Sequence, residues 1–151
     1  MNDLDGHDMT TDHPLPMHVK GLIPHEPPLR LIDRLLAAND QRGIAEAVIR
    51  SESPLLNEDG CLDPAAMIEL IAQAYAAMKG YEDLISGRSS QKGFLVGIAD
   101  FQLAGRAREG QRLRITVETV ASTGGFALAE GEVYHGEEQI AAGTIKVWIP
   151  E

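Results

Sequence analysis

One stretch of this 151-residue chain, LDPAAMIELIAQAYAAMKG from Leu62 to Gly80, constrains the fold more than any other. Both of its ends carry helix signals. Asp63 is suited to cap the first turn, Pro64 fits the first helical position, and Gly80 can end the helix in a left-handed conformation. The residues between these ends are apolar on nearly all sides. We therefore expect a helix that other parts of the protein cover over most of its surface.

The predicted helix has two apolar faces and one acid in its interior. Large side chains recur at helical spacing as one stripe, and Ala65, Ala72 and Ala76 form a second face of small side chains. Glu69 lies on this alanine face, with Gln73 one turn further on. A carboxylate among small apolar groups is costly unless it is paired, protonated or used in chemistry. Glu69 is therefore a candidate functional residue, and the alternative is a satisfied buried or interface carboxylate.

Length, charge and cysteine content exclude several classes of protein. A chain of 151 residues that is 44% hydrophobic can form one domain with a substantial core. Its net charge of −10 argues against general nucleic-acid binding. Glu69 divides the longest apolar run, so no segment is predicted to span a bilayer, and no secretory signal is predicted at the acidic N-terminus. With Cys61 as the only cysteine, we expect a cytoplasmic protein without a disulfide or a thiolate zinc cluster.

The remaining segments predict a tail followed by strands. Residues 1–17, with His7 and His13, are expected to be a flexible acidic tail ahead of a domain at 18–151. A polar, mobile loop is expected at 81–91. Alternating apolar and polar residues predict strands at 43–50, 94–101, 111–120, 126–134 and 139–149. This pattern predicts an α+β domain in which an antiparallel sheet, ending in a four-stranded meander, wraps the helix.

Several segments resemble the 3-hydroxyacyl-ACP dehydratases of the hot-dog fold, namely LIPHEPPLRLIDR, IELIAQ, GFLVGIADFQ and GRAREGQRLRI. The resemblance covers residues 21–149 and is greatest for the dehydratase-like proteins of aryl-polyene pathways, which share a loop like NEDG at 57–60. It implies a hot-dog dimer with a long central helix wrapped by an antiparallel sheet. It also implies chemistry on acyl thioesters of the kind found in fatty acid biosynthesis, carried by acyl carrier protein or CoA, with no metal, nucleotide or redox cofactor.

The resemblance also implies roles for individual residues. Glu69 matches the family's helix acid, which protonates and expels the β-hydroxyl, and Gln73 matches its supporting hydrogen-bonding group. Gly97 matches a glycine whose backbone N–H polarises the thioester carbonyl, although a strand glycine can also mark a bulge or close packing. The family's base is a histidine in the loop before the helix. Counting back from Glu69 without a gap places Leu55 at that position, and residues 51–65 contain no histidine.

The missing histidine leaves several readings of the function open. In a heterodimer, a histidine-bearing hot-dog partner would complete a dehydratase site around Glu69. In an active homodimer, His25 of the IPHEPP segment would serve as the base. A hot-dog thioesterase would use Glu69 to activate water and would not need the loop histidine. A non-catalytic hot-dog scaffold subunit is the remaining alternative. The motifs of the resemblance favour the dehydratase.

A group of arginines near the C-terminal half stands out in this acidic chain. The group consists of Arg106, Arg108, Arg112 and Arg114, and strand alternation places the last two on one face. Such a group can steer an acidic acyl carrier protein or hold the phosphates of CoA. The alternative is a solvated edge strand whose charges prevent pairing with other edges.

Overall fold

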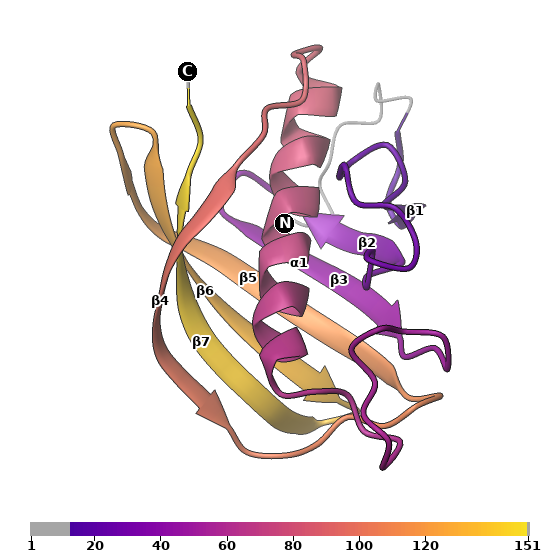
Figure 1. Ribbon diagram of the computed structural model, residues 1–151. Helices are drawn as coiled ribbons and strands as arrows, with labels where there is room; N and C mark the ends of the chain where they lie inside the picture. Colours follow the sequence, from indigo (N-terminus) through magenta and orange to yellow (C-terminus); the bar gives the residue numbers. More distant parts are fainter. Residues whose placement is uncertain (1–12, 151) are drawn as a thin grey trace.

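The computed structural model describes residues 13–150 as one helix packed against one antiparallel sheet (Figure 1). Residues 1–12, which include His7 and most of the predicted tail, lie outside the described residues. The helix α1 is Ala65–Ile85. The strands are β1 (Met17–His18), β2 (Arg34–Ala38), β3 (Arg42–Val48), β4 (Phe94–Leu103), β5 (Arg112–Thr123), β6 (Phe126–His135) and β7 (Glu138–Trp148). The predicted α+β architecture is confirmed.

The strands follow the order β1-β2-β3-β5-β6-β7-β4, and all neighbours are antiparallel. The predicted meander is confirmed for β5, β6 and β7, which tight turns join. The prediction that β4 is the first strand of this meander, beside β5, was wrong, because β4 pairs with β7. Residues 104–111 are long enough to carry the chain across the sheet to β5. Strand β4 is consequently an outer edge of the sheet.

Helix α1 is longer than the sequence predicted. Gly80 does not end it, and residues 81–85, predicted to be loop, form its last turns. Gly80 is needed for a close approach instead, because a Cβ at this position would collide with the carbonyl oxygen of Leu22. At the other end the helix begins at Ala65, directly after Pro64, and Oδ1 of Asp63 accepts a hydrogen bond from the Ala65 N–H at 2.9 Å.

The core lies between α1 and the concave face of the sheet. Alternate residues are buried against the helix along β3, in β5 from Leu113 to Val117 and in β6 from Ala127 to Val133, as strand alternation requires. The large-residue stripe of α1 supplies Ile71, Tyr75 and Met78 to this core. Ile71 packs so closely on β6 that a Cβ on Gly131 would collide with it. No helix in the described part of the chain is long and apolar enough to cross a membrane.

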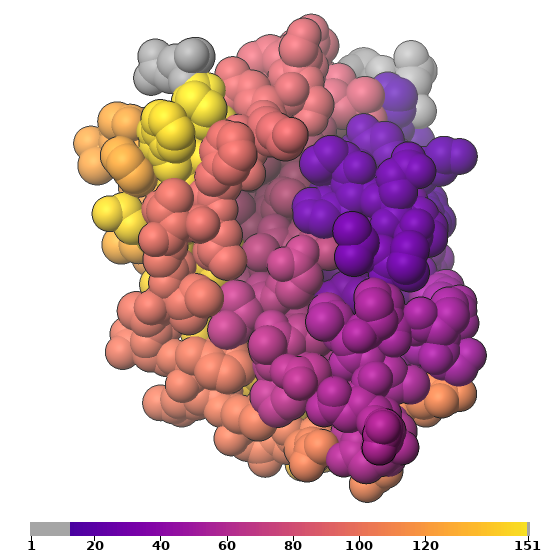
Figure 2. Space-filling view, in the orientation of Figure 1, coloured from indigo at the N-terminus to yellow at the C-terminus, as the bar shows by residue number. Residues whose placement is uncertain are grey.

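Two neighbouring surfaces of the chain are incompletely covered. The alanine face of α1 is partly open, with Ala65 exposed and Ala72 and Ala76 half-buried. Along β4, apolar side chains are 41–50% exposed, namely Phe94, Leu95, Val96, Ile98 and Leu103. Figure 2 shows the helix recessed in a hollow between β4 and the loop that follows β1. An apolar edge strand beside an open helix face is typical of a surface that pairs with another chain.

The close approach at Gly80 generates a prediction about stability. In an ordinary helix, Gly→Ala raises the free energy of unfolding by about 1 kcal/mol. Here the added methyl group collides with backbone, so we expect Gly80→Ala to lower it by about 2 kcal/mol. Urea denaturation followed by circular dichroism measures the change. The control Lys79→Ala, one residue away, should change it by no more than about 0.5 kcal/mol. Stabilisation by Gly80→Ala would contradict the packing described here.

Candidate active site

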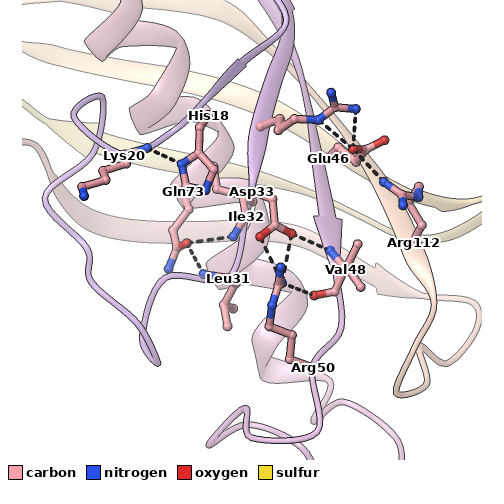
Figure 3. Close-up of polar contacts among 11 residues, drawn as sticks. His18, Lys20, Leu31, Ile32, Asp33, Glu46, Val48, Arg50, Gln73 and Arg112 are labelled. Atoms are coloured by element: carbon pink, nitrogen blue, oxygen red, sulfur yellow. Dashed lines mark hydrogen bonds and ion pairs between the residues drawn. The ribbon is translucent and has the colours of Figure 1, made fainter.

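The side-chain amide of Gln73 fastens the loop after β1 to helix α1. Gln73 is completely buried, and its Oε1 accepts hydrogen bonds from the N–H groups of Leu31 at 2.8 Å and Ile32 at 3.4 Å (Figure 3). Its Nε2 donates to the carbonyl oxygen of Leu29 at 3.0 Å and to Oε2 of Glu69 at 2.7 Å. One side chain thus positions both the loop and the helix acid.

Glu69 is held on one side and open on the other. Its Oε2 accepts the Gln73 bond, whereas Oε1 has no hydrogen bond among the described residues. The side chain is 39% exposed and lies on the alanine face, which leads into the hollow of Figure 2. A carboxyl group with one fixed and one accessible oxygen can exchange a proton with a molecule bound in that hollow.

His25 is the second titratable group beside Glu69. Its Nε2 lies 3.6 Å from Oε2 of Glu69, and its side chain is 32% exposed. Its Nδ1 is buried without a hydrogen-bond partner in the described part of the chain. The ring therefore has its exposed edge, with Nε2, toward Glu69 and its buried edge, with Nδ1, toward the protein interior.

Gly97 lies apart from the cluster of His25, Glu69 and Gln73. It sits in β4 opposite Lys146 of β7, just after a register shift at Val96. Strand β4 is on the other side of α1 from the loop that carries His25 (Figure 1). A Cβ on Gly97 would make only an ordinary contact with Lys146, at 3.5 Å, so packing within the chain does not require a glycine there.

The loop before α1 is held by backbone hydrogen bonds and contains no histidine. Leu55 is half-buried against the core, and its carbonyl oxygen accepts the Asp63 N–H at 2.7 Å. Further along the loop, the Asn57 N–H donates to the carbonyl oxygen of Cys61 at 2.8 Å. The loop is therefore held in place by its own backbone, and Leu55 contributes an aliphatic side chain to it.

Arg106 and Arg108 lie at the loop before α1. Arg106 forms an ion pair of 3.0 Å with Asp59, and both side chains of this pair are exposed. A hydrogen bond from the Cys61 N–H, together with the charges of the two arginines, holds the pKa of the Asp59 carboxyl below its usual value of 3.8. Arg108 has no side-chain ion pair within residues 13–150.

Arg112 and Arg114 lie elsewhere, on the outer face of β5. The prediction that they share a face is confirmed, since both alternate with buried residues of that strand. Arg112 pairs with Glu46 at 2.9 Å, and the Arg114 guanidinium lies 4.9 Å from the centre of the Tyr134 ring. The structure thus divides the four arginines between two surfaces. No group of three His, Cys, Asp or Glu side chains among the described residues is placed to hold a metal ion.

Comparison with known proteins identifies the family. The family model described as ApeP-like, ApeP dehydratase, matches residues 17–151. The chain belongs to the ApeP-like family of dehydratases. It is also 28% identical over 130 residues to the 3-hydroxyacyl-[acyl-carrier-protein] dehydratase FabZ of Symbiobacterium thermophilum, a match that covers 83% of this chain and 89% of that protein. The predicted relationship to the hot-dog dehydratases is confirmed, and the branch that matches is the ApeP-like one.

Solved structures confirm the hot-dog fold. A chain of the dehydratase heterocomplex ApeI:P from Xenorhabdus doucetiae has a TM-score of 0.83 at 23% identity, with coverage of 89% of the ApeP-like chain and 92% of that chain. The protein smu.793 of Streptococcus mutans, bound to acetyl CoA, has a TM-score of 0.62 at 12% identity, with coverage of 85% and 95%. At these identities the likeness concerns the fold.

The four bonds of Gln73 make it a structural as well as a positioning residue. Gln73→Met keeps the size of the side chain but leaves the buried Ile32 N–H, the half-buried Leu31 N–H and the Leu29 carbonyl oxygen without their partner. We expect the free energy of unfolding to fall by about 3 kcal/mol. Urea denaturation measures this fall, and Gln102→Met, at an exposed position of β4, is the matched control. Equal effects of the two substitutions would show that the Gln73 bonds do not stabilise the fold.

Proposed function

We propose that this chain is one half of a 3-hydroxyacyl thioester dehydratase, supplying the acid Glu69 to a site whose base comes from a second hot-dog chain. The proposal depends on two features together. Gln73 holds one oxygen of Glu69 while the side chain stays 39% exposed, and Leu55 occupies the position that we assign to the base. The ApeP-like family supports the reaction class. The X. doucetiae structure, a dehydratase heterocomplex, supports a partner of the same fold.

In the proposed reaction, the partner's imidazole removes a proton from the α-carbon of the 3-hydroxyacyl thioester. The electron pair forms the carbon–carbon double bond, and the carbon–oxygen bond at the β-position breaks. Protonated Glu69 gives its proton to the departing hydroxyl group, which leaves as water. The imidazolium then loses its proton to solvent and Glu69 regains one. Gln73 fixes Oε2, so that Oε1 carries the transferred proton.

The developing charge on the thioester carbonyl needs a hydrogen-bond donor. We assign this role to the backbone N–H of Gly97, because its strand β4 is the exposed edge at which we place the second chain. For the carrier, we assign docking to Arg106 and Arg108, which flank the loop before α1. Arg112 and Arg114 fit this role less well, because they lie on the outer face of the sheet, away from the helix. Acyl carrier protein is the carrier that the name of the FabZ relative suggests.

A homodimer that uses His25 as its base is the runner-up for the dehydratase. The 3.6 Å separation of His25 and Glu69 favours it. The unpartnered Nδ1 counts against it, because a ring that accepts a proton must carry N–H groups on both nitrogens. A thioesterase is the second candidate function, since Glu69 has an accessible oxygen and hydrolysis does not need the loop histidine. A scaffold without chemistry would leave the substrate unchanged.

Glu69→Gln tests the proposed acid. The amide keeps the size of the side chain but has no proton to donate, so dehydration by the complex with a histidine-bearing hot-dog partner should fall by at least about 100-fold. Mass spectrometry of the pantetheine arm of 3-hydroxyacyl-ACP measures the loss of water. Glu58→Gln, in the exposed loop before the helix, is the control and should retain the activity. An unchanged rate of dehydration with Glu69→Gln would contradict the assignment of Glu69 as the acid. Release of the free 3-hydroxy acid from the carrier, in place of loss of water, would indicate a thioesterase.

Leu55→His tests where the base belongs. A histidine at this position would give a homodimer both members of the acid–base pair, so we expect the variant alone to dehydrate 3-hydroxyacyl-ACP where the unchanged chain does not. Leu56→His is the matched control, and the double variant Leu55→His with Glu69→Gln should be inactive. A folded, dimeric Leu55→His protein without activity would argue against the half-site.

A further inference from the structure

A cavity of about 330 Å³ lies on the flank of the domain, separate from the hollow beside β4. Its walls come from the loop after β1, the end of β3 and the residues that follow it, and its floor comes from Leu62 and Leu70. Figure 3 shows part of its wall, with Leu31, Asp33, Val48 and Arg50. The volume falls in the range of small-molecule sites.

The cavity has an apolar interior. Leu62, Leu70 and Ile49 are buried core residues, Leu31 is half-buried, and Pro27 and Pro28 add apolar surface at the rim. Such a lining favours a compact apolar body, because each buried CH₂ group of a ligand contributes about 0.8 kcal/mol. Apolar contacts alone do not fix the orientation of a ligand, so the polar groups of the wall determine its class.

One ion pair in the wall is already satisfied. Oδ2 of Asp33 accepts the Val48 N–H at 2.8 Å, and its carboxylate pairs with Arg50 at 3.0 Å (Figure 3). Arg50 also donates to the carbonyl oxygen of Val48 at 3.0 Å. These groups therefore close the wall and leave little capacity for a ligand.

Two donors of the wall are still available. The half-buried Arg30 has no side-chain hydrogen bond or ion pair with any described residue. His18 uses Nδ1 to accept the Lys20 N–H at 2.9 Å, which leaves Nε2 unused. The remaining carboxylate, that of Glu52, is exposed and accepts a hydrogen bond from Ser51. An available guanidinium above an apolar floor matches a carboxylate attached to an apolar body.

We propose that this cavity binds a small apolar monocarboxylate through Arg30, and that a bound ligand changes how the acid Glu69 is held. The connection is direct. Arg30 and Leu31 line the cavity, and the Leu31 N–H also bonds to Gln73. Leu29 and Ile32, the neighbours of these two residues in the chain, make the other loop bonds to Gln73. A ligand that moves this wall therefore changes how Gln73 holds Glu69. The regulatory part of this proposal rests on the proposed function, whereas the binding part does not.

The test titrates the full chain with octanoate and follows backbone and side-chain amide signals by NMR. We expect saturable shifts at Arg30, Leu31 and the Gln73 side-chain amide. Arg30→Gln should weaken binding at least about tenfold, since it removes a charge-assisted pair. Arg42→Gln removes the same charge from an exposed site on the outer face of the sheet and is the matched control.

The outcomes separate this proposal from the proposed function, because the measurement does not require dehydration. Binding that is equally strong in both variants, or equally strong for 1-octanol, would overturn the assignment to Arg30. Shifts centred on Glu69 and β4 would place the ligand in the hollow instead and would also overturn it. Shifts confined to the cavity, without any change at the Gln73 side chain, would overturn the coupling to Glu69.

Discussion

The hydrogen bonds of the buried Gln73 amide are the interaction on which the site depends. A loop that contains several prolines cannot form regular backbone pairing, so its N–H and carbonyl groups need other partners. Gln73 supplies them for Leu29, Leu31 and Ile32, and in doing so brings His25 to within 3.6 Å of Glu69. The same amide group holds one oxygen of Glu69. Loop placement and the orientation of the acid are therefore set by one side chain.

Sequence periodicity was sufficient for the helix, for most strands and for the face that carries Glu69. Periodicity did not predict features that depend on contacts between distant parts of the chain. A glycine at position 80 predicts a helix end, but in the structure it lets the Leu22 carbonyl oxygen approach the helix. Strand β4 was recognised as a strand, yet its place beside β7 depends on how residues 104–111 cross the sheet. Neither a close approach nor a crossing leaves a periodic pattern in the sequence.

The candidate site was predictable only in part. Glu69 and Gln73 share a helix, so their spacing revealed them together, whereas the Gln73 bonds to the loop span more than 40 residues and follow from tertiary packing. The four arginines appeared as one group in the sequence, but strand and loop geometry separates them. In the function that we propose, Leu55 stands in place of the base, so a complete dehydratase site takes its base from outside this loop. The open β4 edge and alanine face are the surface at which we place the second chain.

The central claim is that this chain holds the acid of a dehydratase site but not its base. The most direct measurement incubates the unchanged, purified chain with 3-hydroxyacyl-ACP, alone and with a histidine-bearing hot-dog partner whose own helix acid is replaced by its amide. Mass spectrometry of the pantetheine arm reports the product. The account predicts no reaction with either protein alone and loss of water when both are present. Dehydration by the chain alone would contradict it.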